Sequence, residues 1–134
     1  MILKLTNKDK NFYEYMGKFF GSRLVQRQTN DRIFDDPDKV WYIYKEGNKI
    51  VAFVSIQKSA IKNIYSTKEE YLEKLLERIK KENKITNSIV TNSYKNLYER
   101  CGFFINNNSN LKNFVTICTE QINENKSSEK EELA

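Results

Sequence analysis

The side chains that most often perform acid–base or metal chemistry are scarce in this chain of 134 residues. Histidine, the commonest general base and metal ligand, is absent. Cys101 and Cys118 have neither metal-ligand spacing nor companions, so we expect two reduced and mostly buried thiols. A zinc site and a histidine-based catalytic triad are therefore excluded.

The charged residues do not supply an obvious general base. Asp35, Asp36 and Glu46 lie in expected loops, where carboxylates are more often solvated than catalytic. The net charge is +5, but acidic residues are interspersed and no dense basic stretch occurs. Arg23, Arg27 and Arg32 could line a binding groove, but a surface role is the stronger expectation. The pattern argues against a nucleic-acid partner.

The stretch from residue 85 to 105 has the most informative local pattern. Its apolar start predicts a strand, after which Thr91 and Ser93 can accept backbone N–H bonds and begin a helix. Apolar residues recur at helical spacing from 94 to 101, and Gly102 stands where a left-handed residue ends a helix. Residues 103–105 resume as a strand.

The other elements that would position this unit follow from hydrophobic periodicity. An amphipathic helix is expected from Phe12 to Leu24, although Gly17 and Gly21 interrupt it. Two β-rich runs flank Gly47 and predict a hairpin. The elements expected in order are a strand at 1–5, the helix at 12–24, strands at 40–46, 49–56 and 60–65, a helix at 67–83, the unit at 85–105 and a strand at 114–119.

Length and composition indicate one domain, residues 1–120, with a charged and flexible C-terminal tail at 121–134. No apolar run approaches ~18 residues and no leader pattern opens the chain, so we expect a cytoplasmic protein without a membrane span.

The sequence LYERCGF at residues 97–103 resembles the C-terminal motif of the GNAT N-acetyltransferases, written LYEKxGF. The predicted order of elements also resembles that family over about residues 1–120. The resemblance implies a single α/β (α+β) domain with a central mixed, mostly antiparallel sheet flanked by helices. It also implies acetyl transfer from acetyl-CoA to an amine of a small molecule or peptide.

In this family the motif tyrosine is placed to donate a proton to the departing CoA thiolate, and Tyr98 matches it. A phenol with a pKa near 10 can serve as that acid at neutral pH. The alternative is a tyrosine buried on the apolar face of the helix, and the position fits both.

The family binds the pyrophosphate of the cofactor on a loop of the form R/Q-x-x-G-x-G/A before the long helix. The matching residues Ser66, Thr67 and Lys68 are followed by Glu69 and Glu70, without glycine or arginine. Lys68 is the nearby cation, whereas the two carboxylates would repel a phosphate. Ser66-x-x-Glu69 or Thr67-x-x-Glu70 would instead make an ordinary capping box, so the loop is degenerate.

For the pantetheine arm, the resemblance implies backbone contacts from a splayed strand, here Asn63, Ile64 and Tyr65. The family often has asparagine seven residues before the motif tyrosine, where this chain has Thr91, with Asn92 next. The enzyme reading therefore predicts a V-shaped opening between the strands near 61–65 and 85–91.

Two other functions stay open at this point. A degenerate GNAT domain could have lost ordinary cofactor binding and act as a module that binds a protein partner. An unrelated binding domain is the least favoured.

Overall fold

The computed structural model describes residues 1–29, 33, 35–106 and 112–120. The predicted tail at 121–134 and most of the loop before the last strand lie outside these residues. The elements in order are β1 Ile2–Leu5, α1 Phe12–Met16, the 3₁₀ turn η1 Gly17–Phe19, α2 Arg23–Thr29, β2 Val40–Glu46, β3 Lys49–Gln57, β4 Ala60–Ser66, α3 Glu69–Glu82, β5 Ser88–Thr91, η2 Asn92–Tyr94, α4 Lys95–Arg100, β6 Phe104–Asn106 and β7 Phe114–Cys118.

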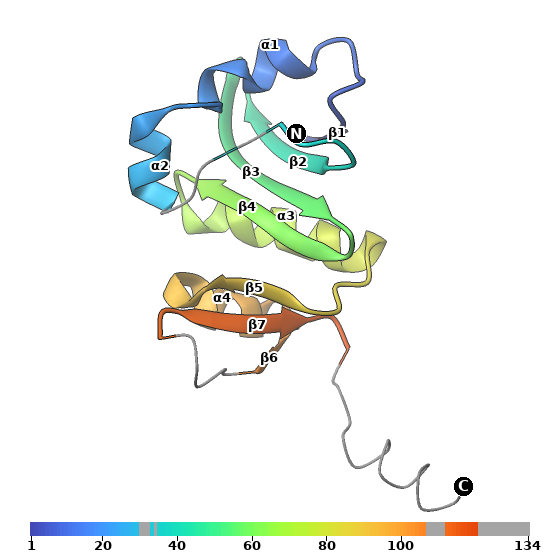
Figure 1. The fold of residues 1–134 in the computed structure, drawn as a ribbon, viewed down its shortest axis with the longest axis vertical. Coiled ribbons are helices and arrows are strands. Elements are labelled where there is room, and N and C mark those ends of the chain that lie inside the picture. Colours follow the sequence, from blue (N-terminus) through green and yellow to red (C-terminus); the bar gives the residue numbers. More distant parts are fainter. Residues whose placement is uncertain (30–32, 34, 107–111, 121–134) are drawn as a thin grey trace, which may run out of the picture.

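The strands form two antiparallel sheets that lie edge to edge. The first has the order β1-β2-β3-β4 and the second the order β5-β7-β6. Figure 1 shows β4 and β5 as the neighbouring edges, running in the same direction. The arrangement is a mixed, mostly antiparallel α+β domain, as predicted.

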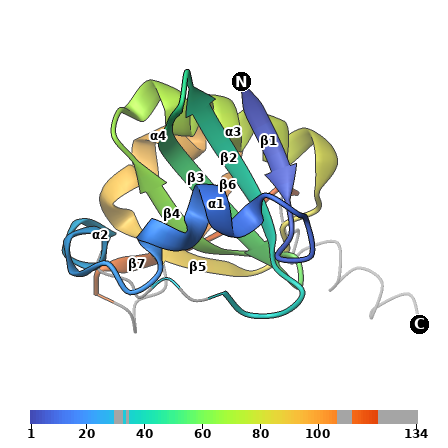
Figure 2. The same ribbon diagram turned by 90° about the horizontal axis from the view of Figure 1, so that it is seen from above.

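Alternation along β2 and β3 gives the first sheet two apolar faces. One face carries Trp41, Ile43 and Phe53, and it packs against Phe12 and Met16 of α1. Figure 2 shows α1 crossing this face. The opposite face is covered by α3, so the central strands are buried on both sides.

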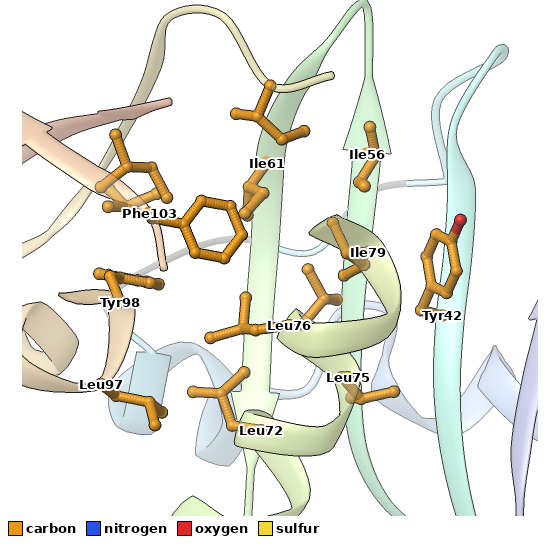
Figure 3. Close-up of a cluster of buried hydrophobic side chains, with 14 of the residues drawn as sticks. Tyr42, Ile56, Ile61, Leu72, Leu75, Leu76, Ile79, Leu97, Tyr98 and Phe103 are labelled. Atoms are coloured by element: carbon orange, nitrogen blue, oxygen red, sulfur yellow. The ribbon is translucent and has the colours of Figure 1, made fainter. Parts of the chain in front are cut away.

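Helix α3 forms because apolar residues recur on one side of its 14 residues while charged residues occupy the rest. Its fully buried side chains Leu72, Leu75, Leu76 and Ile79 lie in one cluster with residues of both sheets and of α4 (Figure 3). One core therefore holds the two sheets together.

The predicted helix from Phe12 to Leu24 is wrong in its second half. The chain turns at Gly21, whose φ of +76° lies in the left-handed region that glycine adopts most readily. The turn redirects α2, so that Val25 is buried and Leu24 is 66% exposed. A single periodic face could not reveal this change of direction.

The C-terminal end of α4 was predicted correctly, whereas the predicted cap at its N-terminal end is wrong. Gly102 has φ +91°, and the N–H groups of Gly102 and Phe103 donate to the carbonyls of Glu99 and Tyr98. These two bonds form a Schellman motif. At the other end, the turn η2 precedes the helix, and no side chain caps either element.

The two cysteines are free thiols, Cys118 buried and Cys101 half-buried, as expected. Among the described residues, no helix has the length and apolar character needed to cross a membrane.

Candidate active site

The feature that stands out is an opening between β4 and β5. The two strands are joined at one end, where the Ser88 hydroxyl bridges the backbone N–H and C=O of Ile61, at 2.9 and 3.1 Å. Thr86 N–H also donates to the Ser59 carbonyl, at 3.2 Å. Beyond this point no ladder joins the strands, which belong to different sheets. A cleft of about 690 Å³ lies there.

A β-bulge in β4 explains why this strand diverges from β5. Ile56 of β3 pairs with Ile61 and Ser55 with Asn63, so Lys62 is an extra residue on β4. A bulge bends its strand and increases the local twist. The bend begins directly after the hydrogen bonds from Ser88, which places the apex of the opening at Ile61.

Three of the predicted cofactor-binding residues line this cleft, namely Ile64, Thr91 and Asn92. The predicted V-shaped opening is therefore present at its predicted place. Its full lining is Gln28, Ile61, Lys62, Ile64, Ile89, Val90, Thr91, Asn92, Ser93, Tyr94, Asn113 and Phe114.

Several lining residues were missed by the sequence analysis. Gln28 comes from α2, Asn113 directly precedes β7, and Phe114 is the first residue of β7. No local signal could have found them, because they reach the cleft only through the packing of distant elements. Tyr94 lies one helical turn before Tyr98, and this spacing predicted that its side chain is in the core rather than in the cleft.

The side chains of Asn63 and Tyr65 point away from the cleft. Asn63 is buried and its Oδ1 accepts hydrogen bonds from Ser55 Oγ and Lys39 Nζ, at 2.7 and 3.0 Å. Tyr65 stacks on Phe53 with ring centroids 5.1 Å apart. Neither residue belongs to the lining of the cleft. Contact with a ligand through their backbone stays a prediction.

Ser66 is the last residue of β4, Thr67 and Lys68 connect it to α3, and all three lie outside the cleft lining. The predicted capping box does not form, because the serine and threonine hydroxyls donate to the carbonyls of Lys68 and Val51. Lys68 is the N-cap, in extended conformation and without a side-chain cap bond. The bond to Val51 is long-range, so a local motif could not predict it.

The carboxylate of Glu69 at the start of α3 is paired with a distant arginine. Arg100 Nη2 of α4 lies 3.2 Å from Glu69 Oε1 and 3.7 Å from Glu73 Oε2. Both partners of the closer pair are more than half exposed, so the contact contributes little stability. It does reduce the negative charge at this helix end.

Tyr98 lies in the core behind the cleft. Its side chain is fully buried, and Figure 3 shows it among Leu97, Phe103 and the α3 side chains. In the part of the chain that the structure describes, its hydroxyl oxygen has no hydrogen-bond partner. Burial, with a smaller contribution from Tyr94, raises the pKa of the Tyr98 phenol above its ordinary value. The phenol therefore keeps its proton at neutral pH.

Tyr94 separates Tyr98 from the cleft. The two rings pack edge to face with centroids 6.5 Å apart, and Tyr94 lines the cleft while Tyr98 does not. Burial raises the pKa of the Tyr94 phenol, and the charge of Glu69 adds to the shift. Tyr94 therefore lies between the cleft and the buried ring of Tyr98.

Comparison with protein-family models finds no match, and comparison with curated proteins finds no significant one. Solved structures do match. An N-acetyltransferase from Staphylococcus aureus Mu50 superposes with a TM-score of 0.58 at 15% identity, covering 88% of this chain and 94% of that chain. An acyl-CoA N-acyltransferase from Pseudomonas aeruginosa also gives 0.58, at 10% identity, covering 90% of this chain and 99% of its own.

Escherichia coli ElaA is similar with a TM-score of 0.55 at 14% identity, covering 90% of this chain and 99% of ElaA. Identities this low show the fold alone. Two antiparallel sheets that part between β4 and β5, with α3 and α4 on a common core, give this chain the fold of the GNAT N-acetyltransferases.

Proposed function

We propose that this chain is an N-acetyltransferase that binds acetyl-CoA with its pantetheine arm in the cleft between β4 and β5. The observation that supports this proposal is the cleft itself, which follows a bulged strand whose outer edge lacks a ladder partner. An exposed strand edge offers N–H and C=O groups to an extended ligand. The amide groups of a pantetheine arm can use them.

When bound, acetyl-CoA supplies an acetyl group activated as a thioester. The cleft offers both apolar and polar contacts to such an arm. Ile64 of β4 and Val90 of β5 provide apolar contact, while Thr91 at the end of β5 and Asn92 after it offer polar groups. Tyr98, the tyrosine of the motif at 97–103, is the proposed proton donor because a phenol is protonated at neutral pH, and Tyr94, which lines the cleft in front of it, is the other candidate.

At the phosphate end, the start of α3 provides the positive end of a helix dipole that no side chain caps, together with Lys68. Glu69 and Glu70 oppose an anion there, although Arg100 balances the first of them. The residues therefore fit the arm better than they fit the pyrophosphate. Acceptors of the proposed reaction are amines of small molecules or peptides.

Acetyl-CoA should raise the melting temperature, because a ligand that binds only the folded state stabilises it by mass action. At about 100 times the dissociation constant, the stabilisation is about 2.7 kcal/mol. Ile64→Trp, which fills the cleft from β4, should abolish the shift. Phe104→Trp, at an exposed position outside the cleft lining, should preserve it.

Differential scanning fluorimetry, with calorimetry at 25 °C, tests this expectation. No shift and no heat with millimolar acetyl-CoA would contradict the enzyme proposal. A degenerate domain that binds a protein partner would then become the leading function.

Neutralising the first turn of α3 should tighten acetyl-CoA binding. The double variant Glu69→Gln, Glu70→Gln removes two charges that oppose a phosphate and releases Arg100 from its nearest partner. Helix-end charges are worth about 0.3–1 kcal/mol each, so we expect the loss of two of them to raise the affinity about three- to thirtyfold by calorimetry. The helix should lose some stability for the same reason.

A matched control changes two exposed acids elsewhere, Glu14→Gln with Glu46→Gln, and gives the same net charge. It should leave the affinity nearly unchanged. If the first variant binds no more tightly than this control, the pyrophosphate does not lie at the start of α3.

A further inference from the structure

The buried polar side chains of this domain gather around the bulge in β4. Among the described residues, the buried polar or charged ones are Lys39, Ser55, Asn63 and Ser88. Ser88 holds Ile61, directly before the bulge, through two hydrogen bonds. The other three meet directly after the bulge, where Asn63 Oδ1 accepts hydrogen bonds from Ser55 Oγ and Lys39 Nζ. We call Lys39, Ser55 and Asn63 the Asn63 cluster.

Lys39 is a costly residue to bury. Its side chain is 4% exposed, and its ammonium lies 3.2 Å from Asp36 Oδ2 and 5.6 Å from the centre of the Trp41 ring. Burying a charge costs free energy that apolar side chains of similar volume avoid. Buried polar groups can instead select one arrangement of the chain among several. At this place in the fold, the arrangement that needs selecting is the register of β4.

The apolar pattern of β4 does not determine its register after Ile61. In the observed, bulged register Asn63 and Tyr65 lie on the face toward α1, whereas Ile64 lines the cleft. A straight strand without the bulge would shift each later residue by one position and exchange the two faces. Asn63 and Tyr65 would then face α3, and Ile64 would leave the cleft. Of residues 62–65, each face would again receive one polar and one apolar side chain.

We propose that the Asn63 cluster positions β4 for cofactor binding by selecting the bulged register. In this register the Asn63 carboxamide lies opposite Ser55 on the neighbouring strand and within reach of Lys39. The stacking of Tyr65 on Phe53 acts in the same direction. Lys39 and Asn63 are positioning residues, since neither lines the cleft. The inference rests on the proposed function, because the cleft that this register creates is the proposed site of acetyl-CoA.

Asn63→Leu should favour the straight register. A leucine at this position suits the apolar face toward α3, where it would lie beside Val54, and it removes the oxygen that accepts from Lys39. If the bulged register falls to about a tenth of the molecules, the apparent affinity for acetyl-CoA falls about tenfold.

Backbone NMR of the free variant measures the same fraction independently. Cross-strand nuclear Overhauser contacts of residue 55 identify the register, with residue 63 in the bulged strand and with residue 62 in the straight one. We expect the bulged fraction from NMR to equal the ratio of the two affinities from calorimetry.

Lys39→Met tests the cluster without changing β4 itself. Methionine retains an unbranched side chain and removes the charge, so the urea midpoint should stay the same or rise. The bulged fraction and the affinity should fall together, about two- to fivefold, because Ser55 still donates to Asn63. Asn63→Asp keeps an oxygen that can accept both bonds and should hold the affinity within about twofold. Lys49→Met makes the same change at an exposed lysine and should alter none of these quantities.

Unchanged affinity in both Asn63→Leu and Lys39→Met would overturn the proposal, as would a loss of affinity while β4 keeps only the bulged register. A lower urea midpoint in Lys39→Met with unchanged affinity would assign the cluster to packing alone and would also overturn it. Absence of acetyl-CoA binding in the wild type would contradict the proposed function instead. The register fractions of the free variants would then still test whether the cluster selects the bulge, and unchanged fractions would overturn that as well.

Discussion

Tyr98→Phe should lower turnover about 100-fold or more while leaving the affinity for acetyl-CoA nearly unchanged. Proton donation to a leaving group is typically worth this much, and the variant removes only the hydroxyl. The ring stays in place, so its contacts with Phe103 and the core should persist. Rates of thiol release, measured with the best amine from an acceptor panel, give kcat and KM separately.

The stability of the same variant distinguishes chemistry from packing. Because the Tyr98 hydroxyl is buried and has no hydrogen-bond partner among the described residues, its removal takes away a desolvated group and breaks no hydrogen bond seen there. We therefore expect the free variant to be as stable as the wild type, or more stable by about 1 kcal/mol. A merely structural tyrosine would show the same stability with turnover intact.

Tyr94→Phe is the matched control, since it makes the same change one helical turn earlier. Tyr94 lines the cleft, so it is the other phenol that could reach a ligand. If turnover falls with Tyr94→Phe and not with Tyr98→Phe, the acid role belongs to Tyr94. Full activity in both variants would end the case for a tyrosine acid.

Most elements could be predicted from the sequence because their signals are local. The hairpin around Gly47, the apolar face of α3 and the stop at Gly102 each depend on residues within a few positions of one another. The region from 12 to 24 differed, since the left-handed turn at Gly21 redirects the chain. Periodicity there predicted a buried Leu24, but the turn exposes it and buries Val25 instead.

In the candidate site, too, some features could be predicted from the sequence and others could not. Ile64, Thr91 and Asn92 could be placed at the cleft, because the order of elements and the motif at 97–103 locate the two strands that part. The pair between Glu69 and Arg100 joins residues 31 positions apart, so no helix-capping rule could predict it. The bulge at Lys62 depends on the pairing of β4 with β3, which a strand pattern does not reveal.

Because the cleft separates β4 from β5, the two sheets must be held together by contacts other than strand pairing. Beyond the bonds from Ser88 and Thr86 that close its apex, β4 and β5 share no ladder, so strand pairing does not join the two sheets. Their connection comes from side chains of α3, which lie in one apolar cluster with β4, β5 and β7. The stability of the whole domain should therefore be sensitive to this helix.

Leu76→Ala should destabilise the domain by about 2–5 kcal/mol, because it removes buried apolar contact and leaves a cavity that rigid neighbours cannot fill. Leu76 is fully buried at the centre of α3 and faces the shared core (Figure 3). Leu24→Ala is the same chemical change at a side chain that is 66% exposed, and it should cost less than about 0.5 kcal/mol. Urea denaturation should show a lower midpoint for Leu76→Ala with an unchanged slope. A midpoint near that of Leu24→Ala would mean that the sheets do not depend on a common core, and a separate transition for each sheet would mean that they unfold independently.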